Sequence, residues 1–260
     1  EPQTAALEAA LTRQNCVLRA PTGSGKSSIG LRFASRVNLA TLVVVWSAEL
    51  LREWRDRCRV ELGLEAGVVR GKRADVRPVT VAMQQTLAEH PEWVAVNAHR
   101  FGCYVADEVQ GFAAPTLFAA VDAFPARYRL GISADERRPD QKEFLVYDLF
   151  GGVAADVDAS ELEACGHIMP VGIRVMPTAF RAEWYSQLAR PTLRHRKRLF
   201  DEIVADPERN QQAVELAVAE AEAGHRVVVW SHRKEHCLQL DAAVSARGVR
   251  SGLLLGGPDY

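Results

Sequence analysis

Residues 19–28 read RAPTGSGKSS, a glycine-rich stretch that ends in a lysine and two serines. Glycines allow successive backbone N–H groups to turn toward a single anion, and a helix that follows such a loop adds the positive end of its dipole. The apolar run at 16–20 predicts a strand before the loop, and a helix is expected from about Ser27. This order of strand, glycine loop and helix predicts a binding site for the phosphates of a nucleotide.

The spacing A-x-x-x-x-G-K-S is that of a Walker A loop, with Ala20 at the first position, where glycine is commoner. Lys26 is expected to meet the β- and γ-phosphates of ATP, and the Ser27 hydroxyl is expected to ligate Mg²⁺. A glycine turn beside a surface lysine is the alternative, and it leaves the flanking strand and helix unexplained. The other expected nucleotide-binding residues of the loop are Thr22, Gly23, Ser24 and Gly25.

A second, acidic element stands at 104–110, which reads YVADEVQ. Its apolar strand would deliver Asp107 and Glu108 to the carboxyl end of the strand, where ligands bind in open α/β sheets. Asp107 is expected to hold Mg²⁺ through its water shell. Glu108 is expected to orient and deprotonate an attacking water molecule.

Composition limits the class of protein and its surroundings. The formal net charge of 260 residues is −1, so a nucleic-acid surface would have to be a local patch. The cysteines are scattered and form no C-x-x-C pair, which argues against a disulfide framework or a thiolate zinc site and predicts a reducing, cytoplasmic location. No apolar run approaches the ~20 residues that span a bilayer, so no membrane partner is expected.

Apolar, β-branched runs alternate with segments that favour helices. Near-continuous apolar runs are typical of strands that are buried on both faces, so the pattern predicts an α/β fold with a parallel sheet flanked by helices. The predicted strands are 16–20, 41–46, 79–83, 103–107 and 127–133.

The pentapeptide VVVWS occurs twice, at 43–47 and at 227–231. Chance similarity between two valine-rich strands is one interpretation, and a pair of related α/β lobes is the other. In the second half, the pattern predicts helices at 192–204 and 208–223, a strand at 226–230, and one further helix after it.

The order of these segments resembles that of superfamily-two helicases and translocases, the DExD/H-box group, over nearly the whole chain. The branch that looks most similar is that of DNA repair and phage helicases. The matching segments are EPQTAAL (1–7) for the upstream glutamine element, APTGSGKS (20–27) for motif I, VVVWSAELLREW (43–54) for motif Ia, VTVAMQQTL (79–87) for motif Ib, DEVQ (107–110) for motif II, RYRLGISADERRPD (127–140) for motif III and RVVVWSHRKEHCLQL (226–240) for motif IV.

The resemblance implies two RecA-like lobes that bind ATP between them and move along DNA, with RNA not excluded. Residues 1–160 would form the ATP-binding lobe, and 161–260 a linker and an incomplete second lobe. Gln3 would read adenine, and Gln110 would hydrogen-bond across the cleft as part of the catalytic set. The expected nucleic-acid contacts are Ser47, Gln85 and Thr86, which would touch phosphates and bind largely without sequence preference.

Four departures from the family pattern bear on the function. Ala48 stands where motif Ia usually has arginine, and Gln110 stands where motif II usually ends in His or Asp. Ser133, Ala134 and Asp135 replace the usual Ser/Thr-Ala-Thr of motif III, where Ser133 and Asp135 are the expected coupling residues. A carboxylate at Asp135 would repel phosphate unless Arg137 or Arg138 pairs with it.

The fourth departure is that motifs V and VI, with their arginine fingers, are absent from the 260 residues. We therefore expect this chain alone to bind ATP and to hydrolyse it slowly. Two alternatives to a helicase core remain: the translocating subunit of a restriction or remodelling complex, and an ATP-gated nucleic-acid clamp with little hydrolysis. The basic runs at 70–77 and 190–198 fit either solvated surfaces or phosphate contacts.

Overall fold

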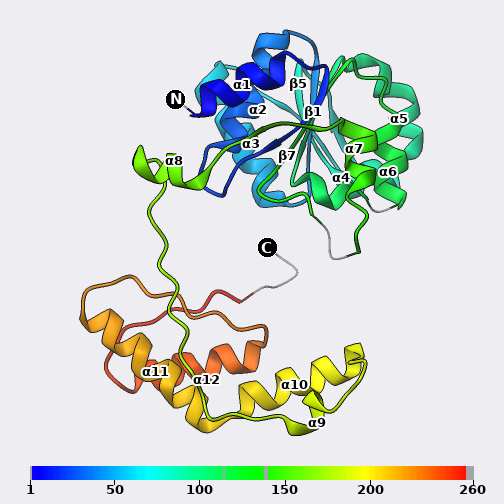
Figure 1. The fold of residues 1–260 in the computed structure, drawn as a ribbon. Coiled ribbons are helices and arrows are strands. Elements are labelled where there is room, and N and C mark those ends of the chain that lie inside the picture. Colours follow the sequence, from blue (N-terminus) through cyan, green and yellow to red (C-terminus); the bar gives the residue numbers. More distant parts are fainter. Residues whose placement is uncertain (1, 114, 138–139, 256–260) are drawn as a thin grey trace. The chain divides into compact units, whose positions relative to one another are not determined.

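The computed structural model describes residues 2–113, 115–137 and 140–255 (Figure 1). The chain divides into two compact units, Glu1–Val171 and Gly172–Tyr260. Helix α8 (Ala159–Ala164), which lies across the expected boundary at residue 160, buries Leu162 in the core of the first unit. The first unit therefore extends past α8.

One eight-stranded sheet forms the centre of the first unit, in the order β4-β3-β5-β2-β6-β7-β1-β8. All neighbouring strands are parallel except β3 and β4, which are antiparallel. The parallel sheet predicted from the apolar runs is confirmed, and the strands that the sequence pattern missed are the short β3, β4 and β8. The bounds are β1 Asn15–Arg19, β2 Thr41–Val45, β3 Gly67–Arg70, β4 Arg73–Asp75, β5 Val79–Met83, β6 Cys103–Asp107, β7 Tyr128–Ser133 and β8 Val153–Asp156.

Helices cover both faces of the sheet, as Figure 1 shows. In β2 all five residues are buried, with Val43 and Val45 in the core on one face and Leu42 and Val44 in the core on the other. Burial on both faces explains why the strand sequence is apolar throughout. The first face carries α1 (Pro2–Leu11), α2 (Lys26–Val37), α3 (Ala48–Leu62) and α8, and the second carries α4 (Gln84–Glu89), α5 (Pro91–Asn97), α6 (Pro115–Asp122) and α7 (Phe144–Phe150).

Helices α2 and α3 approach each other closely at Gly30. A Cβ atom added at Gly30 would lie 2.6 Å from Cη2 of Trp54 and 2.9 Å from Cδ1 of Ile132. Both distances are shorter than carbon atoms allow, so a side chain at this position would displace Trp54 or β7. The absence of a side chain at Gly30 is what lets the fully buried Trp54 lie against α2.

The regular elements in the described part of the second unit are helices, with irregular segments between them: α9 (Glu183–Ser186), α10 (Leu193–Ala205), α11 (Pro207–Glu222) and α12 (Lys234–Ser245). The predicted helices at 192–204 and 208–223, and the one after 231, are therefore confirmed. Their small core packs α11 against α12 through Val214, Ala217, Val218, Leu240 and Val244.

The predicted strand at 226–230 is not formed, and the described part of the second unit contains no strand. A strand needs a neighbour to pair with its backbone N–H and C=O groups. No other strand is available there, and Val228 and Trp230 are 89% and 85% exposed. The apolar, β-branched sequence of this segment is thus not sufficient to make it a strand.

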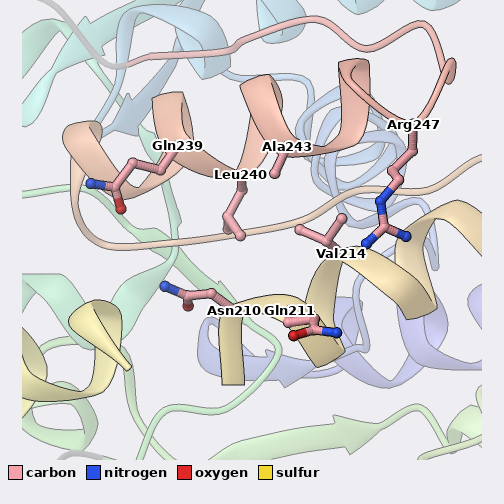
Figure 2. A pocket seen from close by; sticks show the side chains of 7 residues that line it. All are labelled: Asn210, Gln211, Val214, Gln239, Leu240, Ala243 and Arg247. Carbon is pink, nitrogen blue, oxygen red and sulfur yellow. The ribbon is translucent and has the colours of Figure 1, made fainter. Parts of the chain in front are cut away.

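A shallow hollow lies between α11 and α12 (Figure 2). Amide side chains and one arginine surround a short apolar floor, and none of the residues predicted to bind nucleotide or nucleic acid lines it. The lining residues are Asn210, Gln211, Val214, Gln239, Leu240, Ala243 and Arg247.

Gly30→Val tests the close approach of α2 and α3. We expect the free energy of unfolding to fall by about 1–3 kcal/mol, because the added side chain would clash with Trp54 and Ile132 and displace them. Urea unfolding followed by circular dichroism measures this difference. Ser35→Val, an exposed substitution on the same helix, is the matched control, and equal losses in the two variants would contradict the explanation.

Candidate nucleotide-binding site

The predicted phosphate-binding elements lie at the carboxyl ends of three adjacent strands, β1, β7 and β6. Arg19 of β1 is paired with Ser133 of β7, and Ile132 of β7 is paired with Asp107 of β6. The backbone N–H of Ala20, the first residue after β1, donates to the carbonyl of Ser133 at 2.9 Å. Parallel pairing therefore brings motifs I, II and III to one edge of the sheet.

The glycine loop has the backbone geometry of an anion-binding turn. Gly23 and Gly25 have φ angles of 85° and 79°, a left-handed conformation that glycine adopts without steric cost. Gly25 caps the N-terminus of α2, which starts at Lys26. The Ser24 hydroxyl is buried and has no hydrogen-bond partner among the described residues.

Gln3 reaches the loop from α1. Its side-chain nitrogen Nε2 donates to the carbonyl of Ser24 at 3.0 Å. The structure thus places Gln3 beside the glycine loop, while Thr22 is exposed at the loop surface.

A continuous polar relay connects the three motifs. Lys26 Nζ lies 3.6 Å from Oε1 of Glu108, and Gln110 Nε2 donates to Oε2 of Glu108 at 2.7 Å. The Ser133 hydroxyl donates to Oε1 of Gln110 at 2.7 Å and accepts from the backbone N–H of Asp135 at 3.0 Å. One chain of polar contacts, with an ion pair at its first step and hydrogen bonds after it, therefore joins three predicted catalytic residues to both predicted coupling residues.

Asp107 is almost fully buried at the end of β6. Burial raises the pKa of its carboxyl group, and the indole N–H of Trp54, which donates to Oδ2 at 2.8 Å, acts against that rise. Oδ1 accepts from the backbone N–H of Glu108 at 3.0 Å. The other predicted Mg²⁺ ligand, Ser27, donates its hydroxyl to Oε1 of Glu53 at 3.2 Å.

The backbone of Glu108 is strained. Its φ angle is 55°, in the left-handed region that residues with a side chain rarely adopt. This conformation turns the chain sharply after β6, and the carboxylate of Glu108 then lies against Lys26. Strain of this kind concentrates at functional sites.

Asp135 is neutralised by Arg137, as the sequence suggested it would need to be. Arg137 Nε and Nη2 each lie 2.9 Å from a carboxylate oxygen of Asp135. This bidentate pair lowers the pKa of Asp135 to about 2. Arg138, the other proposed partner, lies outside the described residues.

A buried ion pair, which the sequence did not predict, ties the end of β1 to the segment after β7. Both carboxylate oxygens of Glu136, whose side chain is fully buried, accept from the guanidinium of Arg19. The Tyr147 hydroxyl donates to Oε1 of Glu136 at 2.7 Å, and Arg19 also pairs with Asp156 at 3.0 Å. The bonds from Arg19 hold the pKa of Glu136 down to about 2.

The three residues expected to contact nucleic acid differ in their surroundings. Ser47 is the N-cap of α3, and its hydroxyl accepts from the backbone N–H of Leu50 at 3.2 Å. Gln85 is exposed, and its side chain donates to the carbonyl of Trp46 at 3.1 Å. Thr86 is buried, and its hydroxyl accepts from the backbone N–H of Gly71, so this side chain supports the fold and is not presented to a ligand.

Glu136→Gln tests the ion pair with Arg19. At neutral pH we expect a loss of about 1–3 kcal/mol in the free energy of unfolding, toward the lower end because Arg19 is one-third exposed. A carboxyl group whose pKa is lowered on folding stabilises fully above its unfolded pKa of about 4.3, and this contribution disappears as the pH falls toward about 2.

The wild-type chain should therefore lose more stability between pH ~5 and ~2 than the Glu136→Gln variant does. Urea titrations at several pH values measure both slopes, with the exposed Glu89→Gln as the control. The assignment of this stability to Glu136 fails if the two chains show the same acid dependence.

Comparison with known proteins gives the family of the chain. Residues 1–137 match the family model described as type III restriction enzyme, res subunit. The DNA 3'-5' helicase XPB of Kineococcus radiotolerans is 32% identical over 173 residues, which cover 62% of this chain and 31% of that protein. The probable helicase D10 of Escherichia phage T5 is 25% identical over 251 residues, 93% of this chain and 50% of that protein.

Among solved structures, the helicase domain of Pyrococcus furiosus Hef is similar in fold, with a TM-score of 0.53 and 15% identity. The match covers 95% of this chain and 52% of that one. This chain thus spans about a third of the XPB relative and half of the phage relative. It belongs to the family described as type III restriction enzyme, res subunit, within the superfamily-two DExD/H-box group.

Proposed function

We propose that this chain is the ATP-binding core of a DNA helicase or translocase, and that it couples ATP binding and hydrolysis to movement on DNA. The observation that carries the proposal is the relay from Lys26 through Glu108 and Gln110 to Ser133. It joins the lysine that is expected to bind phosphate to a candidate base and then to Ser133 of motif III.

The residues of the glycine loop fit a bound nucleotide. Two glycines in left-handed conformations form the turn, and the buried hydroxyl of Ser24 has no partner among the described residues. Lys26 is 12% exposed and has a single carboxylate, that of Glu108, within 4 Å among the described residues. The phosphates of ATP would give Lys26 and Ser24 the hydrogen bonds that the protein alone does not fully supply.

Mg²⁺ would be held by Ser27 and Asp107, whose hydroxyl and carboxylate oxygens are ligands that this ion prefers. When bound, the ion would neutralise charge on the transferred phosphoryl group. Glu108 would accept the proton of the attacking water, and the amide of Gln110 would hold the Glu108 carboxylate in place through its 2.7 Å hydrogen bond. The hydroxyl of Ser133, which donates to Oε1 of Gln110, would link Gln110 to motif III.

The nucleic-acid partner is proposed from the relatives and from the surface. The XPB and phage T5 relatives are named as helicases, and the name of the first specifies DNA. Ser47 and Gln85 follow the neighbouring parallel strands β2 and β5, so both lie at the carboxyl edge of the sheet. RNA is the alternative partner, and it is tested by measuring whether RNA or DNA stimulates ATP hydrolysis.

A reducing, cytoplasmic location is also proposed. Cys16, Cys58 and Cys103 are free and buried, as expected for thiols that remain unoxidised. Within the described ranges, no helix is both long and apolar enough to cross a membrane.

Translocation on duplex DNA without strand separation is a second candidate. It is supported by the family description, which names a restriction enzyme subunit. A strand-displacement assay separates the two, because a helicase releases the displaced strand and such a translocase does not.

Lys26→Ala and Glu108→Gln test the proposed roles. Lys26→Ala should weaken ATP binding by about tenfold or more, because a charge-assisted contact to phosphate is lost. Glu108→Gln should leave ATP binding within a few-fold while hydrolysis falls by about 10²-fold or more, because the base is lost.

Fluorescence anisotropy of a labelled ATP analogue measures binding, and phosphate release with single-stranded DNA, duplex DNA or RNA measures hydrolysis and identifies the effector. The exposed Glu65→Gln is the control. ATP binding that survives Lys26→Ala unchanged would refute the proposed site, and rapid turnover by the wild-type chain would refute the expectation of slow hydrolysis.

A further inference from the structure

Two consecutive residues of α3 contact the two predicted Mg²⁺ ligands. Trp54 Nε1 donates to Oδ2 of Asp107 at 2.8 Å, and Glu53 Oε1 accepts from the Ser27 hydroxyl at 3.2 Å. Ser27 lies in the first turn of α2 and Asp107 ends β6, so α3 is a third element that contacts both. Neither Glu53 nor Trp54 belongs to the predicted site.

The contact from Trp54 is rigid and has a fixed direction. The side chain of Trp54 is fully buried and lies against Gly30 of α2, where even a Cβ atom would collide with it. An indole N–H can only donate, so it holds Oδ2 of Asp107 as an acceptor. Since the backbone of Glu108 holds Oδ1, the orientation of the Asp107 carboxylate is fixed at both oxygens.

The contact from Glu53 determines which way the Ser27 hydroxyl points. A hydroxyl group has one proton and two lone pairs, and a carboxylate can only accept. With its proton directed to Glu53, the Ser27 oxygen keeps its lone pairs for a cation. Arg57, whose Nε lies 2.9 Å from the same Glu53 oxygen, holds the Glu53 carboxylate in place.

We propose that Glu53 and Trp54 are positioning residues for Mg²⁺, and that the affinity of the site for Mg²⁺ is set from α3. The proposal rests on the proposed function, because it takes Ser27 and Asp107 as the ligands. Partners that orient metal ligands commonly change metal affinity by about 10–100-fold when they are removed. An ordinary structural role for Trp54 would instead change nucleotide binding and stability without singling out Mg²⁺.

The test separates Mg²⁺ binding from nucleotide binding. The affinity for a fluorescent ATP analogue is measured by anisotropy in EDTA and then along a Mg²⁺ titration, using the full chain. For Trp54→Phe, which keeps an aromatic ring but loses the N–H, we expect the Mg²⁺ midpoint to rise about tenfold or more. The affinity in EDTA should remain within about twofold of the wild-type value.

Glu53 provides a second variant, since its side chain is 44% exposed and its loss should not prevent folding. Glu53→Ala should raise the Mg²⁺ midpoint, and Glu53→Gln, which keeps an acceptor oxygen for Ser27, should restore it. Glu61→Ala is a matched control, because Glu61 also accepts from a serine, Ser28, and also pairs with Arg57. Trp93→Phe controls for the loss of an indole elsewhere.

Wild-type Mg²⁺ midpoints in both Glu53→Ala and a folded Trp54→Phe would overturn the proposal, as would equal effects of Glu53→Ala and Glu61→Ala. If Trp54→Phe fails to fold, the proposal is tested by comparing the Mg²⁺ midpoints of the Glu53 variants with that of Glu61→Ala. A wild-type chain that binds the analogue in EDTA but shows no Mg²⁺ dependence overturns this proposal alone. A wild-type chain that binds no analogue under either condition overturns the proposed function as well.

Discussion

The parallel pairing of β1, β7 and β6 is the constraint on which the candidate site depends. Most residues of these strands are buried, and a buried backbone group without a hydrogen bond is costly, so the pairing is not free to open. A slip of one residue would also turn every apolar side chain to the opposite face. The glycine loop, the acidic pair and the Ser133 segment therefore meet because the sheet register brings them together.

Local signals in the sequence predicted much of this arrangement. Apolar runs predicted five strands, and the spacing of glycines and carboxylates predicted the loop and the acidic pair. Side-chain partners distant in the sequence gave no such signal. Arg19 and Glu136 are 117 positions apart, and Trp54 and Asp107 are 53 apart, so only the fold reveals these pairs. Thr86 matched a family pattern, and its burial could not be read from that match.

The two copies of VVVWS show that the intrinsic preference of a segment for extended structure does not by itself decide whether it forms a strand. The copy at 43–47 contributes Val43–Val45 to β2, which is paired with β5 on one side and β6 on the other. The copy at 227–231 has the same residues and forms no strand. Intrinsic preference for extended structure is identical in the two, so the difference comes from whether neighbouring strands are present to accept and donate backbone hydrogen bonds.

The left-handed backbone at Glu108 affects which amino acid is favoured at this position. Glycine adopts a φ angle of 55° without the clash that a Cβ atom introduces, so the fold by itself favours glycine there. Glutamate is present against that preference, and its carboxylate lies between Lys26 and Gln110. At this one residue, conformational stability favours glycine and the proposed chemistry of the site requires a carboxylate, and the chain carries the carboxylate.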